Sequence, residues 1–222
     1  DNTETFLQPE SIPYSKNALI TKSAVGLVLG IMPWNYPFWQ VFRFAIPALM
    51  GGNSVLLKHA PNVTGCALAI ESAFQESKFA KGLFQVVLAD VERTQKLIVD
   101  SRVQRISFTG SNEAGFKIAQ AAGSVGKKCV LELGGSDPFV VLNDAPLEVV
   151  IPQAIKSRFI NAGQSCISAK RMIVHSSIYQ DFVHKFIQEA QKMQFVLQKE
   201  KQEAERKRVE AQGIADYQRI IS

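Results

Sequence analysis

A cysteine within a stretch of small residues is the first candidate for chemistry. Cys166 ends the sequence Asn161-Ala162-Gly163-Gln164-Ser165-Cys166. A thiolate that is stabilised by neighbouring backbone N–H groups is a nucleophile, so this position favours attack on an electrophilic carbon. The competing interpretation is an inert, buried thiol, because free cysteines are commonly buried. That interpretation suits Cys66, in an apolar helical pattern, and Cys129, beside an apolar strand, better than it suits Cys166.

A carboxylate and an amide also stand in unusual surroundings. Glu132 interrupts an apolar strand pattern just before Gly134-Gly135. A charged group there needs either a partner or a role as a base, and a simple edge charge is the plainer alternative. Asn35 lies in the rigid, aromatic-flanked turn Pro33-Trp34-Asn35-Tyr36-Pro37, where its amide can donate to an oxyanion. An ordinary turn asparagine is the alternative.

Two further features suit a phosphate or a ribose. Phe108-Thr109-Gly110-Ser111 ends a strand pattern and opens a helix, and the N–H groups at a helix N-terminus bind anions. The pattern is not GxGxxG, so a plain strand-to-helix turn is the alternative. Lys58 ends another strand and is expected at the carboxyl edge of a parallel sheet, where open α/β sheets bind ligands. A solvated lysine is the alternative there.

The elements that must position these residues alternate between strands and helices. Apolar runs predict strands over residues 25–31, 54–58, 84–88, 105–108, 130–133, 139–142 and 171–175. Amphipathic stretches predict helices over 38–50, 64–75, 92–100, 112–122 and 145–161. The helix over 112–122 has Ser111 or Asn112 as its N-cap, and Gly123 is expected just past its end. This alternation predicts an α/β fold with a Rossmann-like, open and mostly parallel sheet.

Composition excludes several classes of protein. The chain has 222 residues, of which 46% are hydrophobic and 20% are charged, as expected for one or two globular domains. The net charge of +5 is not gathered in a basic block, so nucleic-acid binding is not expected. Three cysteines without a CxxC pair indicate thiols in a reducing compartment, with no metal site. We therefore expect a cytoplasmic protein.

An uncharged run over residues 23–42 raises the question of a membrane span. Pro33, Asn35 and Pro37 lie inside the run and would break a spanning helix, so no membrane segment is expected. The polar, acidic start of the sequence does not fit a signal peptide.

The composition changes near residue 188. The last part of the chain, residues 188–222, is rich in strong helix formers and has opposite charges at helical spacing, such as Glu203 and Lys207. This pattern predicts a charged helical tail. A solvated helix, a coiled-coil surface for a partner and a nucleic-acid contact are the three interpretations of that tail.

Taken together, these motifs resemble a known family. The segments 33–37, 108–111, 132–135 and 163–166, together with Lys58, have the order and spacing of the NAD(P)-dependent aldehyde dehydrogenase superfamily. The resemblance covers roughly residues 10 to 187. The segments 58–62 and 132–138 are similar to those of bacterial succinate-semialdehyde dehydrogenases. The tail from about residue 191 resembles instead the helical segment of prohibitin/band-7 proteins.

The resemblance implies a division of the chain and a role for each candidate. Residues 1–135 would form a partial dinucleotide-binding domain, residues 136–187 the start of a catalytic domain, and residues 188–222 the tail. Cys166 would attack a small aldehyde, Asn35 would hold the oxyanion together with the Cys166 N–H, and Glu132 would activate water. NAD or NADP would contact Ile31, Met32, Pro33, Trp34, Lys58, Gly110, Ser111 and Leu133.

The resemblance also implies a substrate class and an assembly. The reaction would oxidise an aldehyde such as succinate semialdehyde to its carboxylic acid, and the family pattern allows a homo-oligomer. Members that use NAD place a glutamate three residues after the lysine, but Pro61 stands there, so NAD and NADP both stay open. Some relatives hold the substrate carboxylate with two arginines. The matching positions are the apolar Phe42 and Ile160, with Arg43 and Arg158 nearby.

Two other functions compete with this one. After Cys166 the sequence shows neither the family's Glu-x-Phe motif nor its late strand, so we expect the chain by itself to have low activity. A nucleotide-binding fragment fused to an assembly helix is therefore the main alternative. A hydrolase that uses Cys166 with His59, His175 or His184 is the other, although no motif places a histidine beside the thiol.

Overall fold

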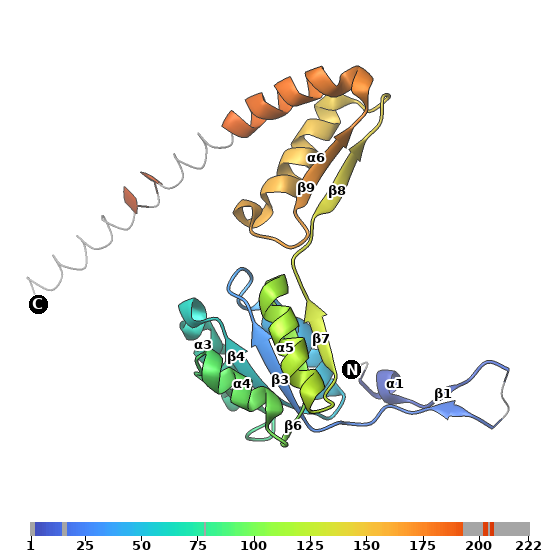
Figure 1. Ribbon diagram of the computed structural model, residues 1–222, viewed down its shortest axis with the longest axis vertical. Helices are drawn as coiled ribbons and strands as arrows, with labels where there is room; N and C mark the ends of the chain where they lie inside the picture. Colours follow the sequence, from blue (N-terminus) through green and yellow to red (C-terminus); the bar gives the residue numbers. More distant parts are fainter. Residues whose placement is uncertain (1–2, 15–16, 78, 193–201, 204, 207–222) are drawn as a thin grey trace, which may run out of the picture. The chain divides into compact units, whose positions relative to one another are not determined.

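The fold is described from a computed structural model of the chain, which describes residues 3–14, 17–77, 79–192, 202–203 and 205–206. It divides into two compact units, Asp1–Gly134 and Gly135–Ser222 (Figure 1). The first begins with the short helix α1 (Thr3–Leu7) and an antiparallel hairpin of β1 (Glu10–Ser11) and β2 (Leu19–Ile20).

A five-stranded sheet in the order β5-β4-β3-β6-β7 forms the centre of the first unit. Its strands are β3 (Leu27–Met32), β4 (Ser54–His59), β5 (Phe84–Val86), β6 (Val103–Thr109) and β7 (Cys129–Glu132). Every neighbouring pair is parallel, so the carboxyl ends of the strands share one edge. The predicted α/β fold with a parallel sheet is confirmed. The strand order reverses between β3 and β6, and such switch points are where open α/β sheets bind ligands.

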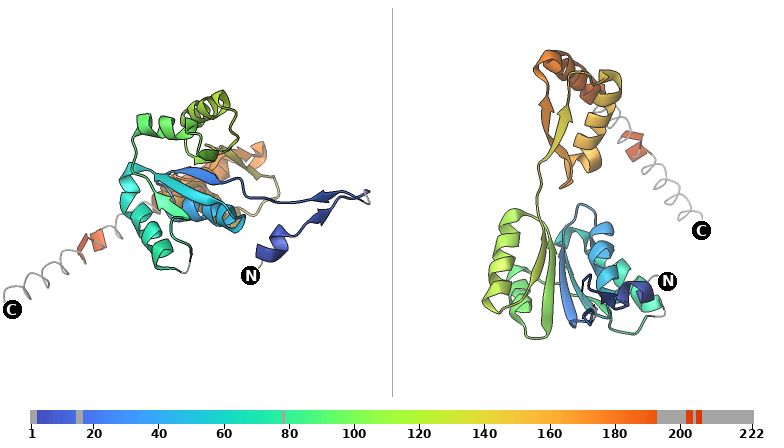
Figure 2. Two further views of the ribbon diagram at one scale, coloured as in Figure 1. Left: turned by 90° about the horizontal axis from the view of Figure 1, so that it is seen from below. Right: turned by 90° about the vertical axis from the view of Figure 1, so that its right-hand side faces the viewer.

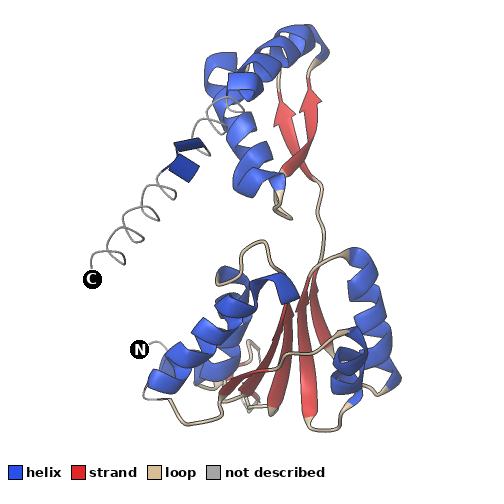
Figure 3. Ribbon diagram, turned by 90° about the vertical axis from the view of Figure 1, so that its left-hand side faces the viewer, coloured by secondary structure: helices blue, strands red, loops and turns tan. Residues whose placement is uncertain are grey.

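Helices cover both faces of this sheet (Figures 2 and 3). The helices α2 (Trp39–Met50) and α3 (Thr64–Glu76) pack on one face, and α4 (Val91–Val99) and α5 (Asn112–Ser124) on the other. Alternate side chains of the strands therefore enter two separate apolar cores. One core is built from Met32, Val41, Ala45, Val55, Leu57, Ala67, Ile70 and Phe84. The other is built from Leu29, Ile31, Ile98, Val103, Ile106, Phe108, Ile118 and Ala122.

A glycine lets α2 lie close to the sheet. A Cβ atom at Gly30 would lie 1.9 Å from Cζ of Phe44, so only glycine leaves room for this ring. Gly30 is paired with Leu57 on one side and Ser107 on the other, in the middle of the sheet. The segment between β3 and α2, which carries the predicted oxyanion donor Asn35, therefore enters a closely packed helix.

The end of α5 corrects one prediction. Gly123 lies inside the helix, which continues to Ser124, and does not follow its end. Gly126, with φ +69°, occupies the left-handed position instead. Its N–H donates to Gly123 O and the N–H of Lys127 donates to Ala122 O, which is the Schellman pattern of a helix C-terminus. A second glycine three residues further along was thus the true stop.

The second unit is smaller. A parallel pair of strands, β8 (Asp137–Val141) and β9 (Ala169–Val174), packs against α6 (Leu147–Phe159) and a helix over residues 179–192. Short 3-10 turns occupy Pro61–Val63 in the first unit, and Ile160–Gly163 and Ser176–Ile178 in this one. The core of the second unit is built from Val141, Ile151, Ala154, Ile155 and Phe182.

Two helix predictions in the second unit need correction. The helix predicted over 145–161 is shorter, because Pro146 stands at its N-cap and Asn161 has a left-handed φ of +50°. Helix already begins at residue 179, before the composition change at 188. Most of the predicted charged tail, namely residues 193–201, 204 and 207–222, lies outside the described residues. Within the described part of the chain, no helix is long and apolar enough to cross a membrane.

Candidate active site

The carboxyl edge of the sheet brings several predicted residues to one row. Lys58 is paired with Ile31, Ile31 with Phe108, and Phe108 with Leu131, across four adjacent strands. Each strand ends within one residue of this row. The segments that follow, including the turn with Asn35 and the Gly110-Ser111 loop, must therefore start from the same edge. The edge contains the switch point between β3 and β6.

The N-terminus of α5 has the form of an anion site. Ser111 is its N-cap, and the hydroxyl accepts a hydrogen bond from the Ala114 N–H at 3.3 Å. A Cβ at Gly115 would lie 2.4 Å from Cδ2 of Leu133, so glycine there lets α5 pack closely against the residue that follows β7, as its position one turn into the helix suggests. The unpaired N–H groups and dipole of this helix favour a negative group beside Gly110 and Ser111.

Two hydrogen bonds tie the Gly110-Ser111 loop to the segment after β7. The Gly110 N–H donates to Glu132 O at 3.0 Å, and the Gly134 N–H donates to Oδ1 of Asn112 at 3.0 Å. The backbone of the predicted base is therefore fixed to the loop that is predicted to hold a phosphate. Leu133 lies between these bonds, and its side chain packs against the core on the α5 side of the sheet.

Lys58 is a half-buried cation at this edge. Burial lowers the pKa of its ammonium group. Among the described residues no carboxylate forms a salt bridge with it. A partly desolvated charge without a protein partner gains most from an anionic or hydroxyl-bearing ligand, and the contact of Lys58 with a ribose or phosphate stays a prediction.

The strand residues predicted beside Lys58 differ in what they can offer. The side chains of Ile31 and Met32 are buried in the two opposite cores, so their contacts with a ligand would come from backbone atoms. Trp34, in the turn after β3, is 44% exposed and presents its ring outside the core. Pro33 is half-buried between them.

Glu132, whose charge was predicted to need either a partner or a role as a base, forms a salt bridge with an arginine. Nη2 of Arg43, on α2, lies 3.1 Å from Oε2 of Glu132. About half of the Glu132 side chain is exposed (52%), so the carboxylate stays open to solvent while the guanidinium balances its charge. Sequence reasoning noted Arg43 only for a different role, because the pairing joins residues far apart in the chain.

Asn35 is half-buried in the turn that joins β3 to α2. This turn is contacted by a residue whose role sequence reasoning missed. His59, at the end of β4, is buried, and its ring nitrogens lie within hydrogen-bonding distance of Met32 O and Pro37 O. The available signal was a histidine at an inward-facing position of β4, directly after Lys58.

Cys166 belongs to the second unit, in a loop with unusual backbone angles. Asn161, Ala162 and Gly163 have φ of +50°, +56° and +77°, a left-handed run that is costly for the two residues with side chains. A Cβ at Gly135 would lie 2.6 Å from the Cys166 carbonyl oxygen, so glycine is needed for this approach. The Lys170 ammonium, on β9, donates to Gly135 O at 2.5 Å and so links β9 to the segment before β8.

The predicted meeting of Cys166 with Asn35 and Glu132 stays a prediction. The hydrolase alternative finds no histidine partner for the thiol in the described part of the second unit. There, His175 is hydrogen-bonded with Ser177, and His184 with Gln188. No group of three or more potential metal ligands occurs within the described residues.

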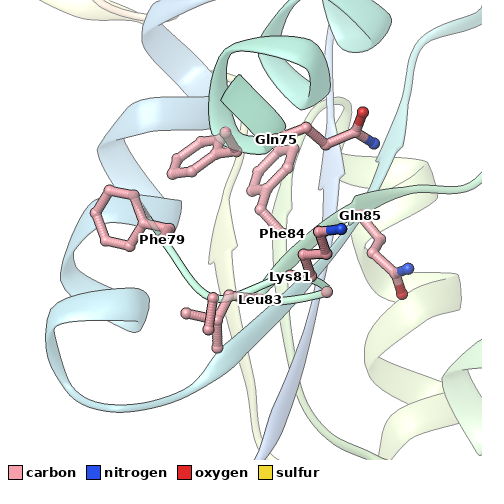
Figure 4. Close-up of a pocket in the computed structure, with 9 residues that line it drawn as sticks. Gln75, Phe79, Lys81, Leu83, Phe84 and Gln85 are labelled. Atoms are coloured by element: carbon pink, nitrogen blue, oxygen red, sulfur yellow. The ribbon is translucent and has the colours of Figure 1, made fainter. Parts of the chain in front are cut away.

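A cavity of about 470 Å³ lies away from these residues. It is lined by the C-terminal end of α3, the following loop and the start of β5, with Phe79, Lys81 and Phe84 around it (Figure 4). The start of β5 is at the amino edge of the parallel sheet, opposite Lys58 and Gly110. This cavity therefore is no part of the predicted site.

Comparison with known proteins decides the family. The sequence profile described as "Aldehyde dehydrogenase family" matches residues 2–205. The chain belongs to the aldehyde dehydrogenase family. The match runs across the expected junction near residue 188, and the resemblance of the tail to prohibitin/band-7 proteins is not shown.

Several members of the aldehyde dehydrogenase family are close in sequence. A probable succinate-semialdehyde dehydrogenase [NADP(+)] of Synechocystis sp. is 49% identical over 183 residues, which is 82% of this chain and 40% of that protein. The succinate semialdehyde dehydrogenase [NAD(P)+] Sad of Escherichia coli is 46% identical over 173 residues, covering 78% of this chain and 37% of that protein. The chain thus spans about two fifths of the length of these relatives.

Solved structures of aldehyde dehydrogenases share the fold. The succinic semialdehyde dehydrogenase of Streptococcus pyogenes, solved with NADP+ as the cofactor, is 32% identical with a TM-score of 0.79. The alignment covers 83% of this chain and 41% of that one. The succinate-semialdehyde dehydrogenase of Burkholderia pseudomallei is 30% identical with a TM-score of 0.79, and the alignment covers 86% and 40% of the two chains.

The residues at the sheet edge of this aldehyde dehydrogenase chain fit a dinucleotide. A pyrophosphate needs a helix N-terminus that a backbone can approach closely, which α5 with Gly110 offers. A ribose or a further phosphate needs a donor, which the half-buried Lys58 ammonium offers. Gly110 follows β6 at the switch point of the parallel sheet, where such ligands bind, and Lys58 lies at the same edge on β4, beside β3.

Proposed function

We propose that the chain contributes the cofactor-binding part and the nucleophile of an aldehyde dehydrogenase that uses NAD or NADP. One observation carries the proposal: Lys58 near the end of β4, the N-terminus of α5 after β6, and Glu132 at the end of β7 lie along one edge of the sheet. A cation, an anion-binding helix end and a carboxylate base in one place are the protein groups that this reaction requires.

Gly110 and Ser111 would hold the cofactor phosphates, and Lys58 the ribose of the adenosine half. The backbone of Ile31 and Met32, with Pro33, Trp34 and Leu133, would form the wall beside them. When bound, the nicotinamide supplies an acceptor for a hydride ion. Pro61 begins the turn after β4 and brings no negative charge, so a 2′-phosphate is tolerated and the site accepts NADP as well as NAD. The names of the relatives from Synechocystis and E. coli are in keeping with this choice.

The residues of the chain would act in a fixed order. The Cys166 thiolate would form a bond to the aldehyde carbon, and the Asn35 amide together with the Cys166 N–H would donate to the oxyanion. Loss of hydride from this adduct would leave a thioester on Cys166. Glu132 would then take a proton from water, which attacks the thioester and releases the carboxylic acid.

Succinate semialdehyde is the substrate that we propose. Curated relatives carry its name, and the substrate has a carboxylate that needs a cation. Arg43 places a guanidinium beside Glu132, in the first unit. Arg158, in the second unit, is the other arginine near a position where relatives hold the carboxylate, while Phe42 and Ile160 at those positions are apolar.

A direct test follows NADPH formation at 340 nm and the covalent state of Cys166. The chain is incubated with NADP+ and succinate semialdehyde, and its intact mass is measured. We expect a thioester on Cys166, and a slower release in Glu132→Gln by about 10²–10⁴-fold, as for loss of a general base. A Cys166→Ser variant should form no thioester. Addition of mass to Cys66 or Cys129 instead would contradict the assignment.

The same measurements, together with a cofactor titration, distinguish the proposed function from its main alternative. Cofactor binding by titration, without any thioester or NADPH, would favour a nucleotide-binding fragment. An oligomer that is lost when residues 188–222 are deleted would add the assembly role to that alternative. Light scattering of the two chains measures this loss.

A further inference from the structure

The turn that carries Asn35 lacks a backbone N–H at each of its two ends. It begins and ends with proline, at Pro33 and Pro37, and proline has no N–H. The carbonyl groups Met32 O and Pro37 O, at its two ends, have hydrogen-bond partners that come from outside the turn. If these ends were not held, the position of the Asn35 amide would vary with them.

His59, on the neighbouring strand, lies beside both ends of this turn. Its Nε2 lies 2.9 Å from Pro37 O, and its Nδ1 lies 3.2 Å from Met32 O. The Ala60 N–H donates to Nδ1 at 3.0 Å and also to Met32 O at 3.0 Å. Because Nε2 faces only a carbonyl group, we assign its hydrogen there, so that Nε2–H donates to Pro37 O and Nδ1 accepts from Ala60.

The side chain of His59 is buried, with 6% of the residue exposed. It is not available to a ligand or to solvent, so its hydrogen bonds serve the fold around the turn. An imidazole ring is suited to this place, because its two nitrogens point in different directions and reach two backbone groups at once. A buried ring of this kind is also rigid, so it fixes the distance between Pro37 O and the Ala60 N–H, which also donates to Met32 O.

We propose that His59 is a positioning residue that holds the Asn35 amide where an oxyanion forms. This inference rests on the proposed role of Asn35 as an oxyanion donor. His59 does not touch the substrate. It acts through the bond from Nε2–H to Pro37 O, which ties the far end of the turn to β4, while the Ala60 N–H ties Met32 O at the other end.

Three variants of the full chain separate the two bonds. His59→Gln places an amide N–H near the position of Nε2, His59→Asn places an amide oxygen only near the position of Nδ1, and His59→Leu keeps neither. Thr94→Val is the matched control, because Thr94 is equally buried and its hydroxyl donates to Asp90 O at 2.6 Å in α4, away from the turn.

The first measurement is the nuclear magnetic resonance signal of the Asn35 side-chain amide in the ¹⁵N-labelled chain. Asn35→Asp identifies the signal by its disappearance. We expect it to shift or broaden in His59→Leu and His59→Asn, and to return toward the wild-type position in His59→Gln. Thr94→Val should leave it in place. An unmoved signal in folded His59→Asn and His59→Leu would overturn the proposal, and this measurement needs no turnover.

The second measurement is the rate of thioester formation on Cys166. Removal of one oxyanion donor costs about 10²–10³-fold, so Asn35→Ala should lose that much and His59→Asn about tenfold or more. In the Asn35→Ala background, His59→Asn should cause no further loss. A full additional loss would overturn the role of His59, whereas an unchanged rate in Asn35→Ala alone would overturn the role of Asn35.

Discussion

At the scale of single residues, two opposite charges lie at one edge of the sheet in the first unit, and they differ in their pairing with other residues. Glu132 is neutralised by Arg43, while Lys58 has no carboxylate partner among the described residues. A binding group without a partner weakens the free protein and strengthens the complex, because its desolvation is offset only when the ligand arrives. Stability and binding are therefore expected to change in opposite directions when Lys58 is replaced.

Lys58→Met tests this opposition. Burial lowers the pKa of Lys58 in the folded protein below its unfolded value, so the charged lysine destabilises the fold at neutral pH. We expect the methionine variant to be more stable at pH 7, by urea denaturation. The difference should shrink as pH rises toward the ordinary pKa of lysine, where the unfolded chain also loses the proton.

The same variant should bind the cofactor less well. A hydrogen bond to a charged group contributes about 1.5–3 kcal/mol, so the Kd for NADP+ should rise about 10- to 150-fold by calorimetry. Lys96→Met is the control, since Lys96 is exposed on α4 and pairs with Glu92. Equal affinity in Lys58→Met and wild type would remove Lys58 from the cofactor site.

Pro61→Glu tests the choice between the two cofactors. The residue is exposed and begins the turn after β4, where a negative charge at a helical N-terminus is tolerated. A carboxylate near the ribose would repel a 2′-phosphate, so the affinity for NADP+ should fall roughly tenfold or more relative to that for NAD+. Asn62→Glu adds the same charge one residue further on and should discriminate less. Parallel titrations with both cofactors measure the ratio, and an unchanged ratio would place the 2′-hydroxyl elsewhere.

At the scale of elements, most of the central sheet could be predicted because buried parallel strands are continuous apolar runs. The runs around Gly30 and Leu57 are of this kind, and both strands form where expected. Helix ends were harder, because two glycines near the end of α5 both suit a stop, and only the backbone shows that Gly126 takes the left-handed position. The local sequence pattern indicates that the helix ends near these glycines, but it does not show which of the two takes the left-handed position.

The candidate site was predictable only in part, for a related reason. Lys58, Ser111 and Glu132 could be placed at one edge because parallel strands end together. The partnership of Glu132 with Arg43, and the hydrogen bonds of His59, join residues whose distance in the chain says nothing about contact. Contacts of this kind depend on which helix packs on which strand, and the hydrophobic periodicity of the sequence does not show that arrangement.

The N-terminus of α5 offers a test at this scale. Ser111→Asp keeps a good N-cap but places a carboxylate where a phosphate is proposed, so stability should change little while the Kd for NADP+ rises at least tenfold. Ser111→Ala removes the N-cap without adding a charge. It should lower the free energy of unfolding by about 1 kcal/mol and change the Kd for NADP+ less than Ser111→Asp does. Urea denaturation and calorimetry on both variants separate the two effects. Tight NADP+ binding by Ser111→Asp would contradict a phosphate at this helix.

At the scale of the whole molecule, the chain contains separate apolar cores in its two units. The residues proposed for the cofactor all belong to the first unit, whereas Cys166 belongs to the second. A ligand stabilises the cooperative unit that holds its site, and a unit with its own core need not follow. Cofactor binding and the loop of the nucleophile can therefore be followed independently.

Both tryptophans, Trp34 and Trp39, lie in the first unit, so their fluorescence reports its unfolding alone. NADP+ at 100 times its Kd should raise the free energy of unfolding of that unit by about 2.7 kcal/mol and shift its urea transition upward. Hydrogen exchange of peptides from α6 and β9 reports the second unit, and its protection in urea should change much less. If both transitions moved together by the full amount, the two units would unfold as one, and the cofactor would stabilise Cys166 and its loop as strongly as the sheet edge.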